Sequence, residues 1–338
     1  MVVILQLFGL ANMEMAVVIV ATRCIIRFFL IYSQGMDDYL MLGALIFTIA
    51  YQATIYVSDI HGGLGMPMAT LSHNEMITFL KCTLAIEIFY YVVIFCIKSS
   101  IVFMYQRFAV GNTFKKLCVG TNILLAAFHL ICVIITLAQC TPLEKSWDIT
   151  KTLPGSCINL TAFFYFTSGF NIIMDIWILL LPIPTLRSLQ ISQRNRYVLY
   201  GVFGIGALAT AMSVVRLYSI HTYTLAADPF KDGALVNVWS MVEVNIGIVC
   251  ASIPALKPLL SPQHLVEIWR KRRGYSSHIT ESSHKKSKLS SASRSHIIAV
   301  ETPNRTESAE SLGIDEDASA ISLPNRVKVT REFTVTTG

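Results

Sequence analysis

Seven long apolar stretches follow one another along this chain, and they constrain its fold more than any other feature. Each is about 20 residues long, which is the length that an α-helix needs to cross the hydrocarbon core of a bilayer. Backbone groups in lipid must find their hydrogen bonds within the segment, which favours helices over open strands. The predicted spans are residues 2–22, 39–57, 84–105, 117–138, 162–183, 198–220 and 236–256.

Charged residues are scarce within this region and common after it. The 338 residues are 54% hydrophobic and only 14% charged, whereas a soluble domain has roughly 25% charged residues. Residues 1–256 contain 26 of the charged residues, and residues 257–338 contain the other 22. We therefore predict a membrane domain at 1–256 that contacts the lipid bilayer. The composition argues against a nucleic-acid partner, despite a net charge of +6.

Basic residues between the apolar stretches predict the orientation of the bundle. One alternate set of loops contains eight Lys and Arg residues, and it comprises residues 23–38, 106–116 and 184–197. The other set contains four, and it comprises residues 58–83, 139–161 and 221–235. Because cytoplasmic loops are enriched in Lys and Arg, we predict an all-α membrane protein. It is a seven-transmembrane helix bundle with its N-terminus outside and its C-terminus in the cytosol.

A signal peptide is the alternative reading of residues 2–22. Such a peptide begins with basic residues, but here Arg23 and Arg27 follow the apolar stretch instead. We therefore expect a membrane span at this position.

The polar region after residue 256 has two predicted parts. Residues 257–275 form a basic amphipathic segment beside the membrane, with Trp269 at the interface and a basic cluster after it. Stop-transfer charge alone is the simpler alternative. Residues 276–338 are rich in Ser, Lys and Glu without periodicity, which predicts a disordered cytosolic tail.

Three of the eight cysteines fall on the predicted outer side, where disulfides form. We favour a Cys140–Cys157 bridge because closure of a short loop is easier, and Cys82 is the competing partner. The chain has no CxxC pair, so no zinc site is expected. Asn159 begins a glycosylation sequon close to the membrane, and an unused sequon is an equally good interpretation.

Six charged residues fall within the predicted spans, where each costs roughly 2.5–3.5 kcal/mol unless it is paired or near an end. They are Glu14, Glu87, Lys98, Asp175, Arg216 and Glu243. Counting along the spans places Lys98 level with Asp175, and Arg216 level with Glu243. We therefore predict two ion pairs inside the bundle, Lys98–Asp175 and Arg216–Glu243. Glu14 has no partner that the sequence assigns.

The polar residues nearer the outer side also predict a ligand pocket. Glu87 and Tyr91 share one face of their helix with Lys98 at 100° per residue. With Arg216 and Glu243 they form a candidate ligand-binding group, and Arg216 pairs either with Glu243 or with an anionic ligand. The alternative is that these residues only fix helix packing, which we favour for the inner Lys98–Asp175 pair. His129 stands alone in its span and is expected to be a packed histidine rather than a metal ligand.

A set of short motifs is distributed between residues 10 and 260. They include Asp37-Asp38-Tyr39, His61-Gly62-Gly63, Cys140-Thr141-Pro142, Leu180-Leu181-Pro182, Trp239 with Glu243, and Ala251 with Pro254. As a set they resemble the fungal rhodopsin-domain integral membrane family. That resemblance implies a fungal multi-pass membrane protein. Members of the family include receptor-like proteins linked to pathogenicity and membrane proteins of mycotoxin gene clusters such as the satratoxin cluster. Residues 236–256 contain no Lys, so no retinal cofactor is expected.

Three functions compete on this evidence. The first is a receptor-like signalling protein with a small-molecule ligand and a cytosolic partner at the inner loops and tail, and with the plasma membrane as the favoured location. The second is a transporter or accessory protein of a secondary-metabolite gene cluster. The third is a membrane enzyme, but the sequence displays no nucleophile–base pair or metal-ligand cluster. We therefore expect no enzymatic activity and no cofactor.

Overall fold

The computed structural model describes residues 2–256 apart from residues 33, 109–110, 151, 184–192 and 227. The segments predicted at 257–275 and 276–338 lie outside the described residues. Seven α-helices make up most of the described chain. They are α1 (Val2–Cys24), α2 (Met36–His61), α3 (His73–Phe108), α4 (Asn112–Leu137), α5 (Leu160–Leu180), α7 (Gln193–Leu225) and α8 (Pro229–Leu256).

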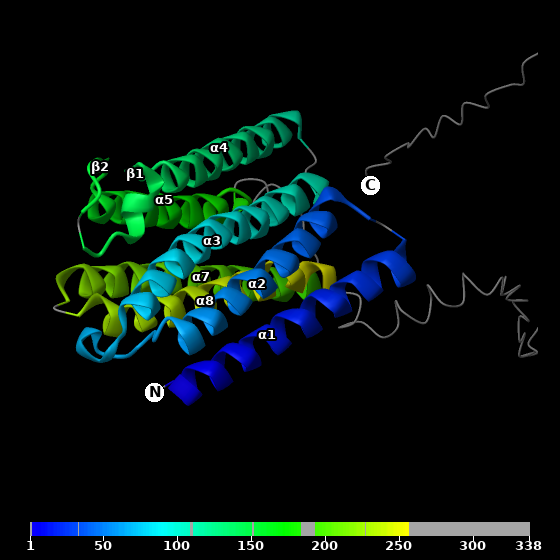
Figure 1. Ribbon diagram of the computed structural model, residues 1–338. Coiled ribbons are helices and arrows are strands. Elements are labelled where there is room, and N and C mark those ends of the chain that lie inside the picture. Colours follow the sequence, from blue (N-terminus) through cyan, green and yellow to red (C-terminus); the bar gives the residue numbers. More distant parts are fainter. Residues whose placement is uncertain are drawn as a thin grey trace, which may run out of the picture. The chain divides into compact units, whose positions relative to one another are not determined.

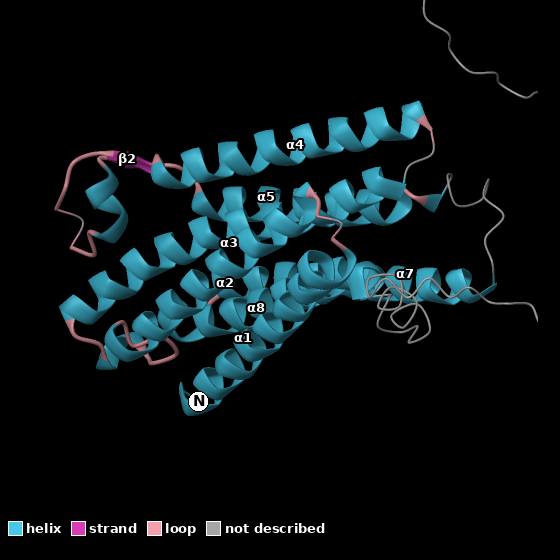
Figure 2. Ribbon diagram, turned by 90° about the vertical axis from the view of Figure 1, so that its right-hand side faces the viewer, coloured by secondary structure: helices cyan, strands magenta, loops and turns pink. Residues whose placement is uncertain are grey.

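The helices pack into one bundle, in which α4 lies at one edge and α1 at the opposite edge (Figures 1 and 2). Helix α3 occupies the middle, where it contacts α2, α4, α5 and α8. Helix α8 packs on α7 and α1. The buried core is built mainly from α1, α2, α3 and α8, with residues such as Val20, Met41, Ile97 and Ile248 fully or almost fully buried.

Within the described residues, six helices are long and apolar enough to cross a membrane. They are α2, α3, α4, α5 and the segments Phe203–Leu225 of α7 and Gly233–Leu256 of α8. Large apolar side chains on these helices point away from the bundle, among them Ile46, Leu130 and Ile173, each more than 60% exposed. Exposed apolar surface of this extent is suited to lipid. The chain is therefore an integral multi-pass membrane protein, while the span at α1 and the orientation of the termini stay predictions.

Helix α3 begins earlier than the sequence predicted. It starts at His73 rather than at residue 84, so part of the predicted loop 58–83 is helical. The Ser72 backbone N–H and hydroxyl both donate to the Glu75 carboxylate, at 2.7 and 2.8 Å, and these bonds fix the first turn. Apolar periodicity alone missed this start because the first turn is polar and Thr78, Lys81 and Thr83 interrupt the apolar residues that follow.

The predicted loop 23–38 is also partly helical. After α1 the chain continues as a π-helix, η1 (Ile25–Ile31), and α2 begins at Met36. The charge of Arg23 suggested that the helix ends there. The chain instead stays helical through η1, and Arg23 is fully buried and paired with two carboxylates of α2.

A disulfide hairpin joins α4 to α5. Strands β1 (Cys140–Thr141) and β2 (Ser156–Cys157) pair antiparallel, and the predicted Cys140–Cys157 bridge connects them. Cys82, the competing partner, is buried and reduced. Between the strands, the 3-10 helix η3 (Leu143–Trp147) brings Trp147 within 5.2 Å of the Lys81 ammonium on α3. We call this end of the bundle the hairpin end, and the opposite end, which holds Arg23, the arginine end.

Asn159, the predicted sequon residue, caps α5 with its side chain. Its Oδ1 accepts a hydrogen bond from the Ala162 backbone N–H at 3.1 Å. The residue is exposed at the hairpin end. This position explains why helix α5 starts at Leu160, since Asn is among the best N-cap residues.

Candidate functional site

Arg216 and Glu243, predicted to pair, lie together between α7 and α8. The Nε of Arg216 is 3.7 Å from Oε2 of Glu243 and donates to the Ser240 hydroxyl at 3.1 Å. The guanidinium also lies over the ring of Tyr90 on α3, 3.9 Å from its centroid. The Tyr90 hydroxyl donates to Oε2 of Glu243 at 3.0 Å. Three helices therefore hold the arginine and the glutamate in place.

Lys98 and Asp175 also lie together, nearer the arginine end of the bundle. The Lys98 ammonium is 3.0 Å from Oδ1 of Asp175 and joins α3 to α5. It donates further hydrogen bonds to the carbonyl and the side-chain oxygen of Asn171, at 2.9 and 3.1 Å. The lysine is 4% exposed, so its charge is satisfied almost entirely by protein oxygens.

Ser213 on α7 connects these two ion pairs. Its Oγ is 2.8 Å from Oδ2 of Asp175 and 2.8 Å from Oε1 of Glu243. Lys98, Asp175, Ser213, Glu243 and Arg216 thus form one continuous row, which we call the polar chain. Ser213 was not predicted as a site residue, although its position three residues before Arg216 places both on one face of α7.

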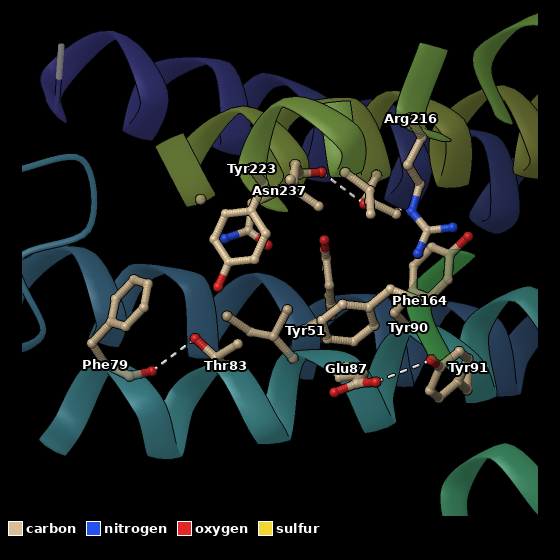
Figure 3. A pocket seen from close by; sticks show the side chains of 15 residues that line it. Tyr51, Phe79, Thr83, Glu87, Tyr90, Tyr91, Phe164, Arg216, Tyr223 and Asn237 are labelled. Atoms are coloured by element: carbon tan, nitrogen blue, oxygen red, sulfur yellow. Dashed lines mark hydrogen bonds between the residues drawn. The ribbon is translucent and has the colours of Figure 1, made fainter. Parts of the chain in front are cut away.

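A pocket lies between the polar chain and the hairpin end of the bundle. Glu87, Tyr91 and Phe79 project into it from α3, and Arg216 and Tyr223 project into it from α7 (Figure 3). Of the four residues predicted to bind a ligand, Glu87, Tyr91 and Arg216 line this pocket. Glu243 does not line it and instead lines a second cavity together with Lys98 and Asp175. Sequence position gave the depth of Glu243 beside Arg216 correctly, but it could not give the cavity that the side chain faces.

The pocket contains a hydroxyl group without a hydrogen-bond partner and a carboxyl group without a cationic partner. The Tyr51 hydroxyl on α2 is buried and makes no hydrogen bond within the described part of the chain. Glu87 accepts a hydrogen bond from the Tyr91 hydroxyl at 3.0 Å. Among the described residues, Glu87 has no cationic partner within ion-pair distance. Tyr51 lies in an apolar span with no charged residue three or four positions away, so the sequence did not single it out.

The size of the pocket limits what it can hold. Its volume is about 100 Å³, whereas pockets for drug-sized ligands occupy roughly 300–1,000 Å³. Aromatic and aliphatic side chains form most of the wall, including Phe79, Phe164 and Ile220. The geometry therefore suits a small ligand, or one polar group of a larger ligand that enters from the hairpin end.

A second charged cluster lies at the arginine end and was not predicted as a site. Arg23 is fully buried, and its guanidinium reaches Asp37 at 2.7 Å, Asp38 at 2.9 Å and the Ala251 carbonyl at 2.6 Å. The Ser100 hydroxyl donates to the Asp37 carbonyl at 2.8 Å. These contacts tie α1, α2, α3 and α8 together. In the sequence, Arg23 indicated only the topology, and Asp37-Asp38 was only one of the family motifs.

His129 and Glu14 line neither the pocket nor the second cavity. His129 is buried, and its Nδ1 lies 2.8 Å from the Leu125 carbonyl, as for a packed histidine. Glu14 is exposed on α1. Within the described ranges, no group of three or more His, Cys, Asp or Glu side chains is placed to hold a metal ion.

Comparison with known families assigns the chain through its membrane domain. Residues 22–262 match the Fungal rhodopsin domain, which covers most of the chain. The chain belongs to this family. The resemblance inferred from the motifs is therefore confirmed, and the family spans both the polar chain and the pocket.

Relatives within the family have names of two kinds. A protein named Receptor GIN3 from Arthrobotrys oligospora is 25% identical over 66% of this chain and 54% of its own length. A SAT4 family membrane protein from Emericella nidulans is 27% identical over 61% of this chain and 52% of its own. Satratoxin biosynthesis SC1 cluster protein 4 from Stachybotrys chartarum is 26% identical over 48% of this chain and 59% of its own. The chain thus spans only about half to three fifths of these relatives, and no solved structure matches it.

Proposed function

We propose that this fungal membrane protein is receptor-like and that it binds a small ligand in the pocket beside Arg216. The observation that carries the proposal is the polar chain beneath the pocket. Arg216 faces the pocket at one end of that chain, and Lys98 on α3 ends it 3.0 Å from Asp175 on α5. A ligand that changes the partners of Arg216 would therefore alter contacts among α3, α5, α7 and α8. A coupled change of this kind is what a receptor requires.

Glu87, Tyr91 and Arg216 are the proposed ligand contacts. Glu243 is proposed to influence the ligand indirectly, by holding Arg216 in position. The orientation that fits this function has seven spans, the N-terminus outside and the C-terminus in the cytosol. In that orientation the pocket opens to the exterior of the plasma membrane. The basic loops at the arginine end would then face the cytosolic signalling partner. No enzymatic step is part of this proposal.

A binding experiment tests the pocket directly. The full chain in lipid nanodiscs is heated with and without chromatographic fractions of fungal culture medium. A ligand that binds only the folded state raises the melting temperature. At a concentration of 100 times its Kd it adds about 2.7 kcal/mol to the free energy of unfolding. We expect an active fraction to stabilise the native protein and to have no effect on Arg216→Ala. The matched control is Val214→Ala, because Val214 is exposed two residues away on the same helix.

Two results decide against the ligand pocket. One is the absence of any stabilising fraction for the native protein. The other is equal stabilisation of the native protein, Arg216→Ala and Val214→Ala, which would place binding elsewhere. A response of cytosolic signalling to the active fraction in living cells separates a receptor from a protein that only binds.

A role in a secondary-metabolite gene cluster is the second candidate. The name of the Stachybotrys chartarum relative favours it, since that protein is assigned to a satratoxin biosynthesis cluster. In this case the protein would be a transporter or an accessory membrane protein. Deletion of the gene would then cause a metabolite to accumulate inside cells while signalling stays unchanged. Normal export together with a lost signalling response would favour the receptor instead.

A further inference from the structure

The contacts of Ser213 contain one hydrogen atom too few. Its Oγ lies 2.8 Å from a carboxylate oxygen of Asp175 and 2.8 Å from one of Glu243. A serine hydroxyl has a single hydrogen to donate. If both carboxylates were ionised, one of these short contacts would bring an oxygen lone pair against an anionic oxygen. A second hydrogen is therefore needed at this point in the bundle.

The formal charges around the polar chain also call for one added proton, although the count does not say which carboxyl group takes it. Two cations, Lys98 and Arg216, lie with three carboxyl groups, Asp175, Glu243 and Glu87. The sum is −1 when all five groups are ionised. An unpaired charge inside an apolar bundle is costly, and such a group takes up or releases a proton instead. One added proton makes the sum zero.

We propose that the bundle contains a buried proton-binding site in which Glu243 is protonated. The Oε1–H of Glu243 donates to the Ser213 hydroxyl, and that hydroxyl donates to Oδ2 of Asp175. Every short contact of Ser213 then has its own hydrogen. Oε2 of Glu243 remains an acceptor for the Tyr90 hydroxyl at 3.0 Å, so that bond is kept.

The cations decide which of the two carboxyl groups holds the proton. The Lys98 ammonium is 3.0 Å from Asp175, close enough to keep that carboxylate ionised. The Nε of Arg216 is 3.7 Å from Glu243, and its hydrogen is directed to Ser240 at 3.1 Å. Glu243 is therefore the less stabilised anion of the pair.

Other titratable groups face this site from the helices around it. On α2 the group is Tyr51, on α3 they are Tyr90, Lys98 and Tyr105, on α5 Asp175, on α7 Arg216, and on α8 Cys250. His129 of α4 packs on Phe95 of α3, whose ring centroid is 6.0 Å from its own. Glu87 lines the pocket above and is the competing place for the proton. The experiment must therefore distinguish Glu243 from Glu87.

Infrared spectroscopy of the full chain in lipid vesicles at neutral pH tests the site, because a protonated carboxyl has its own C=O stretching band. We expect this band to shift when glutamate side chains are labelled with carbon-13, and not when aspartate is labelled. It should be lost in Glu243→Gln and kept in Glu87→Gln. The variant Glu14→Gln is the control for the exposed glutamate of α1. Ser213→Ala should shift the band, since the acid loses its acceptor, whereas Ser213→Thr should leave it near its original position.

Three results would overturn the proposal, namely no carboxylic acid band, a band that shifts only with labelled aspartate, or a band that disappears in Glu87→Gln. If Glu243→Gln fails to fold, the labelled native protein and the Glu87→Gln and Glu14→Gln variants still decide the outcome. A glutamate band that survives both of these substitutions leaves Glu243 as its source among the buried glutamates that the structure describes. The result does not depend on whether the pocket binds a ligand.

Discussion

The Nε of Arg23 donates to the Asp38 carboxylate at 2.9 Å, and both side chains are completely buried. Asp37 accepts a second hydrogen bond from the same guanidinium at 2.7 Å. An arginine at the end of one helix is thereby fixed to the first turn of the next. The same side chain also donates to the Ala251 carbonyl of α8, so Arg23 joins α1, α2 and α8 at the arginine end of the bundle.

Substitution of Arg23 is expected to destabilise the protein strongly. Arg23→Ala leaves Asp37 and Asp38 buried without their main partner, and breaking a buried pair in this way costs about 3–5 kcal/mol. Arg27→Ala is the matched control, since Arg27 lies 3.9 Å from each carboxylate. Thermal unfolding in nanodiscs measures both variants. Equal melting temperatures for the two variants would contradict a special role for Arg23.

The Lys98–Asp175 pair predicts strong coupling between the two residues. Lys98→Met leaves the Asp175 carboxylate without its cation, and Asp175→Leu leaves the Lys98 ammonium without its anion. Each single change should therefore lower the free energy of unfolding by about 3–5 kcal/mol. The double variant removes both charges and should cost clearly less than the sum of the two. A double-mutant cycle on unfolding free energies gives the interaction energy. Additive losses would indicate that the pair contributes packing alone.

The Cys140–Cys157 disulfide should stabilise the loop between α4 and α5. It closes a separation of 17 residues, and a loop of this length corresponds to about 3 kcal/mol in the chain-entropy account. Reductant should lower the melting temperature of the native protein and leave Cys140→Ser/Cys157→Ser unchanged. Cys82→Ser, which removes a buried free thiol, should keep its response to reductant. A Cys82→Ser protein that no longer responds would point to a bridge made by Cys82.

The loop around Asp148 should loosen in acid. Hydrogen bonds from the Thr150 hydroxyl and the Leu153 backbone N–H hold the pKa of Asp148 below its ordinary value. A lowered pKa in the folded state means that the stabilisation is present above the ordinary pKa of the carboxyl. It is lost as the pH falls through the lowered value. Amide exchange at Leu153, corrected for its intrinsic pH dependence, should therefore increase in acid. Asp148→Asn should remove this dependence, and an unchanged acid response in that variant would refute it.

The depth of charged residues in the bundle was predictable from the sequence. Each residue advances a helix by about 1.5 Å, so counting from the ends of the spans brought Lys98 level with Asp175. The same count placed Arg216 beside Glu243. Helix ends were less predictable, since the polar first turns of α3 and the π-helical Ile25–Ile31 do not follow the apolar pattern.

The sequence by itself determined that this chain is a helical membrane protein of the fungal rhodopsin domain family, with charges at matched depths. It also indicated the pairing of Cys140 with Cys157. Only the tertiary structure decided that Ser213 joins Asp175 to Glu243, that Tyr51 lines the pocket and that Arg23 is buried between two aspartates. The physical reason is that sequence spacing fixes height along a helix. The rotation of each helix and the neighbour it faces are set by packing against other helices.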